Sequence, residues 1–433
     1  MIASIDAKIA LEEAREQYAS NNPESLAKHV EACTVLPGGN TRTVLFYPPF
    51  PLTMVRGEGS RLWDADDHEY IDLLGEYTAG LYGHSNPVIR AAIEKALDRG
   101  IDLGSQNGLE AKLAAMICGR FPSIDFVRFT NSGTEANLMA VSAARAITRR
   151  SKVLVFDGAY HGGVFSFAGG GNPINAPFEF VVARYNDLDY TMALLERNVE
   201  DLAAVMIEPM MGAGGCIPAE TSFLRALREA TREHGILLIF DEVMTSRLSP
   251  SGLQGMHGIL PDITTLGKYI GGGMTCGAFG GRSEIMQHFD VRQPCAFPHA
   301  GTFNNNVLTM SAGLAGMSLY TPELAQQHNA RGDGLRRRLN DLVKKNGLKM
   351  QFTGIGSMLN VHMCIGPIHS PADAAKADKD LADLFFFDLL AKGFWFARRG
   401  MIVLSLPNTD SDCDQFAAAV EEFINMRGSL LTV

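Results

Sequence analysis

The sequence has no long apolar run, no excess of basic residues and no paired cysteine motif. None of its hydrophobic stretches approaches the roughly 20 residues that a membrane-spanning helix needs. The first residues, Met1 to Asp6, lack a basic segment followed by an apolar core. Its seven cysteines are scattered, and no Cys-x-x-Cys pair suggests zinc or a redox centre. We therefore expect a soluble protein of a reducing compartment, the cytoplasm, with no membrane contact and no metal.

Basic residues are also outnumbered, because 38 Lys and Arg stand against 48 Asp and Glu for a net charge of −10. Without a basic field to attract phosphate backbones, nucleic acid is not an expected partner. Apolar residues, in contrast, are plentiful: 46% of the 433 residues are hydrophobic. That is enough for large buried cores in roughly two to three domains.

The order of the expected elements divides the chain into three parts. In residues 1–64, two amphipathic helices broken at Asn22-Pro23 precede two short strands. Residues 65–324 alternate strands with helices, which favours an α/β fold: a large domain with a mostly parallel central sheet covered by helices. Residues 325–433 indicate a smaller α+β domain, against which the N-terminal segment is expected to pack. The strands expected in the large domain are 126–130, 153–156, 178–182, 203–208 and 236–241.

Two charged residues in apolar surroundings point to a cofactor. An apolar run from Leu237 ends in Asp241, and Lys268 lies between apolar residues and three glycines. Buried charges are unfavourable unless they are paired. Pyridoxal 5'-phosphate (PLP) explains both, since its cationic ring nitrogen suits Asp241 and its aldehyde suits Lys268. The alternatives are a buried acid paired with an arginine and an ordinary surface lysine.

A phosphate seat is expected where Ser132, Gly133 and Thr134 follow one strand and open a helix. Free backbone N–H groups at a helix N-terminus bind anions, and the two hydroxyls add donors. An ordinary helix cap would show the same pattern.

Two further strand ends carry candidate residues. Tyr160 follows the strand 153–156 and is a candidate for stacking on a flat ring, although a capping aromatic in a turn is the alternative. The neighbouring His161 is given no chemical role. Glu208 ends another strand before a glycine loop, where it could orient the cofactor or the lysine, or take part in a salt bridge.

Taken in order, these motifs resemble the class III aminotransferases of PLP fold type I, essentially from end to end. Within that class the chain is similar to the branch that holds glutamate-1-semialdehyde aminomutase and the β-amino-acid (β-phenylalanine) transaminases. It departs from the aminomutase pattern at Ser246-Arg247-Leu248, where that enzyme continues with Gly-Phe-Arg. The motifs that carry the resemblance are Ser132-Gly133-Thr134-Glu135-Ala136, Tyr160-His161-Gly162, Glu208-Pro209, Phe240-Asp241-Glu242-Val243, Leu266-Gly267-Lys268 and Gly301-Thr302-Phe303.

The resemblance implies a role for each matching position. The phosphate would be held by Ser132, Gly133 and Thr134, and the ring would lie between Tyr160 and Met244. Asp241 would bind the ring nitrogen and Lys268 would be the Schiff-base lysine. Thr302 would reach the phosphate of the neighbouring subunit, which implies a homodimer with shared active sites.

Two arginines are the candidates for substrate carboxylates, because a guanidinium binds a carboxylate with two parallel hydrogen bonds. The resemblance suggests that Arg42 binds the carboxylate of a β-amino acid and that Arg399 binds the α-carboxylate of a keto acid. Tyr77 and Tyr47 are expected to line the apolar side of the pocket. The alternatives are loop arginines at the surface and tyrosines packed in a core.

The sequence thus predicts a PLP-dependent transaminase that moves the amino group of a β-amino acid, aromatic ones included, to a 2-oxo acid such as 2-oxoglutarate or pyruvate. Lys268 would move the proton between carbon atoms. The alternatives are an aminomutase of the glutamate-1-semialdehyde type, an amine transaminase for simple chiral amines, and a non-catalytic protein that reuses the fold.

Overall fold

A seven-stranded sheet forms the centre of the large part of the molecule. The computed structural model describes residues 2–101 and 103–432, and its strand order in this sheet is β4-β12-β11-β10-β7-β5-β6. All neighbours run parallel except β12, which is antiparallel to both β11 and β4. The expected mostly parallel α/β sheet is therefore confirmed. The strands are β4 (Phe126–Thr130), β5 (Lys152–Phe156), β6 (Glu179–Ala183), β7 (Leu202–Ile207), β10 (Leu237–Asp241), β11 (Ile263–Gly267) and β12 (Gly277–Gly281).

The strand β12 was not among the expected strands because three of its five residues are glycines. The glycines are needed for close packing rather than for flexibility. A Cβ atom at Gly277 would lie 2.1 Å from the backbone oxygen of Ser132, and one at Gly281 would lie 2.2 Å from that of Asp262. The backbone of β12 can approach these neighbours this closely only because glycine has no side chain.

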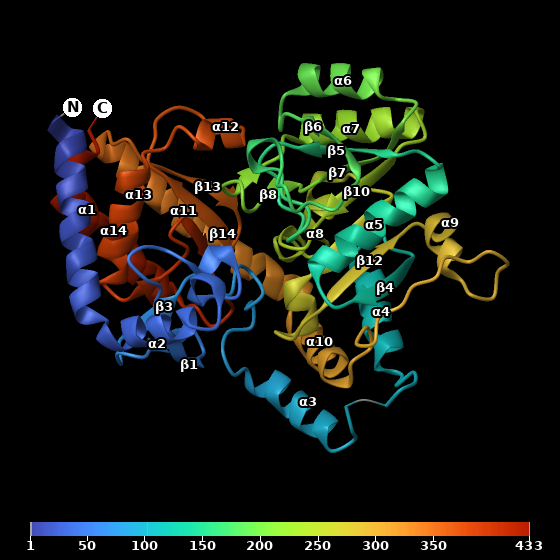
Figure 1. Cartoon of the computed structure of the whole chain (residues 1–433), viewed down its shortest axis with the longest axis horizontal. Coiled ribbons are helices and arrows are strands. Elements are labelled where there is room, and N and C mark those ends of the chain that lie inside the picture. Colours follow the sequence, from blue (N-terminus) through green and yellow to red (C-terminus); the bar gives the residue numbers. More distant parts are fainter. Residues whose placement is uncertain (1, 102, 433) are drawn as a thin grey trace.

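Helices cover this sheet, and Figure 1 shows α6 and α7 above the strands and α3 and α10 below them. In α7 the buried residues Phe223, Leu224, Leu227 and Thr231 recur at helical spacing and form one face. The helices of this part are α3 (Pro87–Leu97), α4 (Leu109–Arg120), α5 (Gly133–Thr148), α6 (Leu188–Arg197), α7 (Thr221–Glu233), α8 (Gly252–His257), α9 (Ser283–Met286) and α10 (Val307–Leu319). A two-stranded sheet of β8 (Met210–Met211) and β9 (Ile217–Pro218) follows β7.

The N-terminal and C-terminal segments share a second core. Leu11, Tyr18 and Phe50 belong to one buried cluster with Phe385 and Phe416, and both ends of the chain lie on the same side of the molecule (Figure 1). The N-terminal helices α1 (Ile2–Asn21) and α2 (Pro23–Cys33) are separated where the sequence predicted the break. The C-terminal helices are α12 (Pro371–Ala374), α13 (Lys379–Leu390) and α14 (Asp410–Arg427).

Two small sheets complete this part. One is four-stranded in the order β1-β2-β3-β15, and the other is three-stranded in the order β13-β14-β16. The strand β3 lies beyond residue 64 and pairs with β15, so the boundary at residue 64 stays a prediction. The strands are β1 (Met54–Glu58), β2 (Arg61–Asp64), β3 (Glu69–Asp72), β13 (Gln351–Ile355), β14 (Met358–His362), β15 (Phe394–Trp395) and β16 (Met401–Val403).

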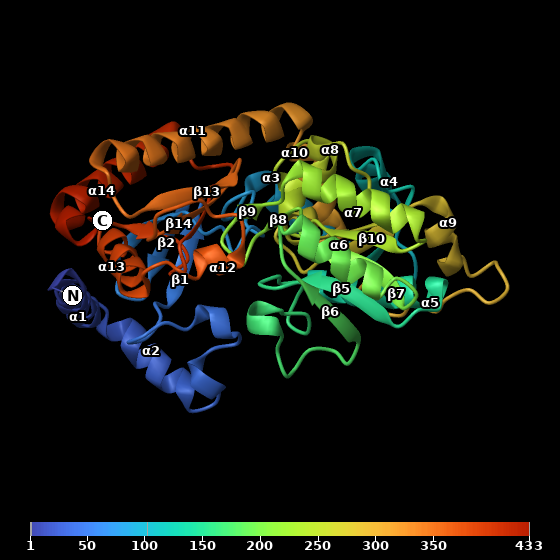
Figure 2. The same ribbon diagram turned by 90° about the horizontal axis from the view of Figure 1, so that it is seen from above.

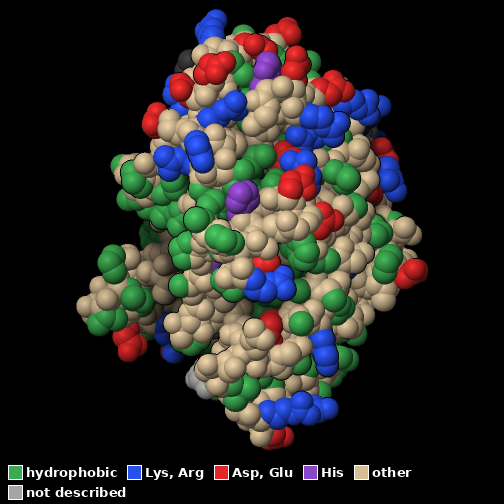
Figure 3. Space-filling model, turned by 90° about the vertical axis from the view of Figure 1, so that its right-hand side faces the viewer, with side chains coloured by type: hydrophobic (Ala, Val, Ile, Leu, Met, Phe, Trp, Pro, Cys, Tyr) green, Lys and Arg blue, Asp and Glu red, His purple; other side chains and the backbone are tan. Residues whose placement is uncertain are grey.

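The helix α11 (Pro322–Asn346) bridges the two cores, as Figure 2 shows. Its first turns place Ala325 in a core of the large part, whereas Leu335, Leu339 and Val343 lie in the shared N- and C-terminal core. Among the described residues, no helix is long and apolar enough to span a membrane. Lys and Arg alternate with Asp and Glu over the face seen in Figure 3.

Candidate active site

Three neighbouring parallel strands deliver charged side chains to one edge of the central sheet. Asp241 is the last residue of β10, Lys268 follows β11 directly, and Glu208 follows β7 directly. These strands are adjacent in the order β11-β10-β7. Because parallel strands point the same way, their carboxyl ends meet, and this edge is where open α/β sheets bind ligands.

Asp241 is buried and held by three hydrogen bonds. Its Oδ2 accepts hydrogen bonds from Asn137 Nδ2 and from His161 Nδ1, both at 2.8 Å, and its Oδ1 accepts one from the backbone N–H of Val243 at 3.0 Å. Asn137 in turn donates to the backbone oxygen of His161 at 2.8 Å. These partners fix the orientation of the carboxylate without an arginine, so the expectation of a plain acid–arginine pair does not describe this residue.

His161 contacts Asp241, although the sequence analysis left it without a role. Its side chain is fully buried, and its Nε2 has no hydrogen-bond partner among the described residues. No local pattern signals the contact, because His161 and Asp241 are 80 positions apart in the chain.

Lys268 lies at this edge of the sheet, and the pKa of its amine is lowered. Burial, and next the positive charge of Arg399, lower the pKa of its amine to about 8. Its Nζ donates a hydrogen bond to the backbone oxygen of Tyr77. Its backbone has φ = 58°, in the left-handed region that non-glycine residues seldom adopt. A neutral amine is a nucleophile, and roughly a tenth of this lysine is neutral at pH 7.

Glu208 is buried and organises two loops. Its Oε1 accepts a hydrogen bond from the backbone N–H of Tyr160 at 3.0 Å, and its Oε2 accepts one from that of Gly212 at 2.9 Å. Burial raises the pKa of this carboxyl to about 7, Asp241 adds to the rise, and His161 opposes it. Gly212 leaves room for Met244, whose sulfur would lie 2.5 Å from a Cβ at that glycine.

The start of α5 forms a tight backbone cradle. The Ser132 hydroxyl accepts a hydrogen bond from the N–H of Glu135 at 3.1 Å, so the residue does cap the helix. The Thr134 hydroxyl accepts one from the N–H of Gly163 at 3.2 Å. A Cβ at Gly133 would lie 2.8 Å from a methyl carbon of Val243. This cradle therefore approaches the loop after Asp241 as closely as glycine allows.

Tyr160 and Thr302 are accessible in the single chain. Tyr160 is 46% exposed, and its ring is free for contact with a ligand. Thr302 is exposed in a loop that an Asn131–Asn304 hydrogen bond of 3.1 Å ties to the cradle. Both positions fit the roles that the resemblance implies, which stay predictions.

Tyr77 joins the two predicted substrate arginines to Lys268. The guanidinium carbon of Arg399 lies 5.2 Å from the centre of the Tyr77 ring, and that of Arg42 lies 5.7 Å from it. Arg42 also forms an ion pair with Glu76. Both arginines therefore lie against the ring of the residue whose backbone oxygen accepts a hydrogen bond from the Lys268 amine.

The segment that carries Tyr77 is strained. Glu76, Tyr77 and Thr78 have φ values of 48°, 53° and 79°, and Gly75 before them has 51°. Each non-glycine residue in such a conformation costs about 1–3 kcal/mol and needs support from its surroundings. Asp72 supplies part of it, because its Oδ1 accepts hydrogen bonds from the N–H groups of Leu74 and Gly75 at 2.8 and 2.9 Å.

Known proteins match this chain over nearly its whole length. The class-III aminotransferase family matches residues 46–422. The chain belongs to this family.

A β-phenylalanine transaminase from Variovorax paradoxus is 52% identical over 424 residues, which are 98% of this chain and 97% of that protein. A glutamate-1-semialdehyde 2,1-aminomutase from Methanosarcina acetivorans is 37% identical over 402 residues, which are 89% of this chain and 92% of that protein. The crystal structure of a β-phenylalanine aminotransferase from Variovorax paradoxus superimposes with a TM-score of 0.97 at 52% identity, over 98% of this chain and 99% of that one.

Class-III aminotransferases depend on PLP, and the residues of this aminotransferase fit that cofactor. Gly133 and Gly277 keep side chains out of the cradle at the start of α5. Asp241 is a buried carboxylate with neutral hydrogen-bond donors around it, which suits a cationic ring nitrogen. Lys268 has the lowered pKa that a nucleophilic amine needs.

Tyr47 does not line the site of the aminotransferase, so that prediction is corrected here. Its side chain is buried, its hydroxyl accepts a hydrogen bond from the N–H of Leu52 at 2.9 Å, and its ring lies 5.2 Å from that of Phe386. It belongs to the core shared by the N- and C-terminal segments. The aromatic run around it gave no sign of which rings face inward, because Pro48, Pro49 and Pro51 interrupt any regular period.

Arg247 is a second residue whose importance the sequence did not reveal. The side chain is fully buried, and it donates hydrogen bonds to the backbone oxygens of Thr78, at 3.3 Å, and of Leu404. Arg247 thus links the strained segment that carries Tyr77 to the residue after β16, Leu404. The only signal in the sequence was the departure from the aminomutase pattern at this position.

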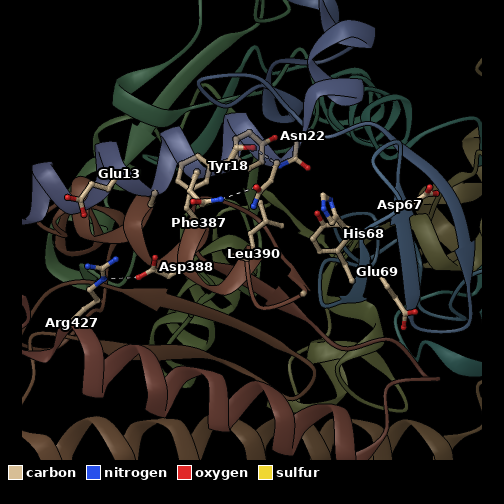
Figure 4. A pocket seen from close by; sticks show the side chains of 16 residues that line it. Glu13, Tyr18, Asn22, Asp67, His68, Glu69, Phe387, Asp388, Leu390 and Arg427 are labelled. Carbon is tan, nitrogen blue, oxygen red and sulfur yellow. Dashed lines mark hydrogen bonds and ion pairs between the residues drawn. The ribbon is translucent and has the colours of Figure 1, made fainter.

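A cavity of about 570 Å³ lies elsewhere, between α1 and α13. Figure 4 shows Tyr18, Phe387, Asp388 and Arg427 around it, and none of the residues predicted to bind cofactor lines it. Its size alone does not make it the active site. The strand ends, which bring Asp241, Lys268 and Glu208 together, are the candidate active site.

Proposed function

We propose that this aminotransferase transfers the amino group of a β-amino acid, aromatic ones included, to a 2-oxo acid such as 2-oxoglutarate or pyruvate. One observation carries the proposal: Arg42 and Arg399 both lie over the ring of Tyr77, whose backbone oxygen receives the Lys268 amine. Two guanidiniums over the ring of one residue, whose backbone oxygen receives the reactive amine, suit an enzyme that must bind two different carboxylates in turn. The 52% identity with a β-phenylalanine transaminase supports the same substrate class.

The cofactor, when bound, supplies an aldehyde for the amino group and a ring that withdraws electrons from the substrate carbon. Ser132, Gly133 and Thr134 would bind its phosphate, and Tyr160 and Met244 would lie against its ring. Asp241, held in place by Asn137 and His161, would keep a proton on the ring nitrogen. Glu208 would fix the loop that carries Tyr160.

Lys268 would take the proton from the substrate carbon and return it to the cofactor side, acting as base and then as acid. Its pKa of about 8 lies close to neutral pH, where both forms are populated. In the first half of the exchange Arg42 would bind the carboxylate of the β-amino acid. In the second half Arg399 would bind the α-carboxylate of the 2-oxo acid.

A homodimer with shared active sites and a cytoplasmic location complete the proposal. Thr302 and Phe303 are exposed beside the phosphate cradle, Phe303 by 56%. An exposed aromatic next to a ligand site favours a partner subunit there, with Thr302 reaching the partner's phosphate.

A panel of amino donors against one 2-oxo acid tests the proposal. We expect β-phenylalanine to give more than one equivalent of the corresponding β-keto acid per active site only when a 2-oxo acid is present. Turnover without a 2-oxo acid would instead identify an aminomutase, which the 37% identity with one such enzyme makes the specific alternative. Fast reaction of simple chiral amines with no reaction of β-phenylalanine would reject the substrate class.

A further inference from the structure

The two arginines at the site differ in their partners. Arg42 is paired with the carboxylate of Glu76. For Arg399, no carboxylate among residues 2–101 and 103–432 lies within the 4.0 Å of an ion pair, and the guanidinium contacts only the sulfur of Met401 at 3.9 Å as a side-chain hydrogen-bond acceptor. Before substrate binds, the site thus offers one free guanidinium and one that is already occupied.

The Arg42–Glu76 pair is easily replaced. The two side chains are 46% and 57% exposed, and ion pairs exposed to this extent contribute little stability because water competes for both partners. A substrate carboxylate can offer the same two oxygens in a less hydrated place. Glu76 is therefore a weak competitor for Arg42 rather than a permanent partner.

The backbone directly before Glu76 is anchored, whereas its side chain is more than half exposed. Glu76 lies in the left-handed segment that the Asp72 carboxylate anchors through Leu74 and Gly75. The side chain of Glu76 also lines a cavity of about 420 Å³ that His84 and Lys28 border. The cavity gives a displaced carboxylate room beside Lys28, whereas His84 is already paired with Asp72.

We propose that Glu76 is a specificity-determining residue that occupies Arg42 until the carboxylate of the amino donor displaces it. The inference rests on the proposed function, since it assigns Arg42 to that carboxylate. A donor with a carboxylate at the right distance exchanges with Glu76, whereas an acceptor held by Arg399 leaves the Arg42–Glu76 pair closed. The exchange keeps Arg42 neutralised in both halves of the reaction, so the two guanidiniums over Tyr77 are never unpaired at the same time.

The variant Glu76→Gln tests this exchange, because glutamine keeps the length of the side chain and removes its charge. The matched control is Glu58→Gln, which removes an acid that is also more than half exposed from the Arg56–Glu58 pair outside the site. The probe is 3-phenylpropanoate, which carries the carboxylate but no amine and cannot react. Its Kd for the holoenzyme is measured by calorimetry, and KM is measured for β-phenylalanine and for the 2-oxo acid.

We expect Glu76→Gln to lower the Kd of 3-phenylpropanoate and the KM of β-phenylalanine by about two- to fivefold, the range that loss of a weak competing ion pair allows. The KM of the 2-oxo acid and all values of Glu58→Gln should stay unchanged. In an Arg42→Gln background, Glu76→Gln should have no further effect on the probe, because the competed group is gone.

An unchanged Kd of 3-phenylpropanoate in Glu76→Gln overturns the inference. An increased Kd overturns it too, because Glu76 would then orient Arg42 for substrate. Equal tightening in Glu58→Gln also overturns it, since net charge alone would explain the gain. Failure of the proposed function is distinguishable: it appears as a wild-type enzyme that does not transaminate β-phenylalanine, whatever the probe shows. Unfolding temperatures of the variants identify any loss of fold.

Discussion

The Nδ1 of His161 donates a hydrogen bond to Oδ2 of Asp241 across 2.8 Å, although the two residues are 80 positions apart. A carboxylate can only accept, so this ring nitrogen carries the proton. Together with Asn137 and the Val243 N–H, the histidine holds the acid at the end of β10 in one orientation. The acid is thereby prepared for a cation that arrives with the cofactor.

Replacing members of this pair should reduce activity by different amounts. We expect Asp241→Asn to lower kcat/KM by about 10²–10³-fold, the usual effect of removing one preorganised electrostatic group. His161→Phe removes one hydrogen bond to a charged group and should lower it by at least about tenfold. Exposed His369, paired with Glu220, provides the control His369→Asn, which should have wild-type kinetics. Wild-type kinetics in His161→Phe would mean that Asp241 needs no support from this ring.

The reactivity of Lys268 should rise with pH through a midpoint near 8. Its pKa is lowered to about 8 by burial and by Arg399, and only the neutral amine attacks an aldehyde. The rate at which apoenzyme incorporates PLP, followed by absorbance, should therefore increase from pH 7 to pH 9. In Arg399→Leu a positive neighbour is lost, the protonated amine is stabilised, and the midpoint should move to higher pH. A midpoint that stays in place would show that Arg399 does not act on this lysine.

The lowered pKa of Lys268 also makes the free energy of unfolding depend on pH. The folded apoenzyme holds the Lys268 proton less tightly than the unfolded chain, whose lysine has the ordinary value of 10.5. Between about pH 8 and 10.5 the unfolded state thus binds more protons, so this residue makes the free energy of unfolding rise with pH in that window. Urea unfolding of wild type and Lys268→Met across the window should show that the wild type alone gains this increment.

Gly277 should not tolerate a side chain. In Gly277→Ala the new Cβ would lie 2.1 Å from the backbone oxygen of Ser132, so the strand or the start of α5 must move. Overpacking of this kind costs about 1–3 kcal/mol. We expect weaker PLP binding and a lower free energy of unfolding, measured by titration and by urea. The control is Gly119→Ala in α4, where a Cβ meets nothing within 4 Å and helix propensity predicts a small gain.

Tyr77 should act through its ring and not through its hydroxyl. The hydroxyl has one weak contact, to the backbone oxygen of Val44 at 3.3 Å, so Tyr77→Phe should leave the kinetics unchanged. Tyr77→Ala removes the surface beneath Arg42 and Arg399, and exposed contacts of this kind contribute about 0.5–1 kcal/mol each. KM should rise several-fold for both donor and acceptor. Because Lys268 binds the backbone oxygen of Tyr77, kcat should change less than KM.

Much of the fold could be predicted from local pattern. The five expected strands of the large domain match β4, β5, β6, β7 and β10 to within one residue at each end. The break between α1 and α2 was also predicted correctly. The strands β11 and β12 were missed. The glycines of β12 carry no hydrophobic signal, and only the contacts of its backbone explain them. Tyr47 was misplaced because an irregular aromatic run has no period to assign a face.

By itself the sequence determined five of the seven strands of the central sheet, the helix start at Ser132 and the placement of Asp241 at a strand end, because burial and backbone geometry leave local, periodic traces in a chain. Only the tertiary structure decided which side chains meet. The bond of His161 to Asp241, the burial of Arg247 under Thr78 and Leu404, and the position of both arginines over Tyr77 join segments from 35 to more than 300 residues apart. Such contacts arise when parallel strands bring their ends to one edge, and no local period of the sequence records them.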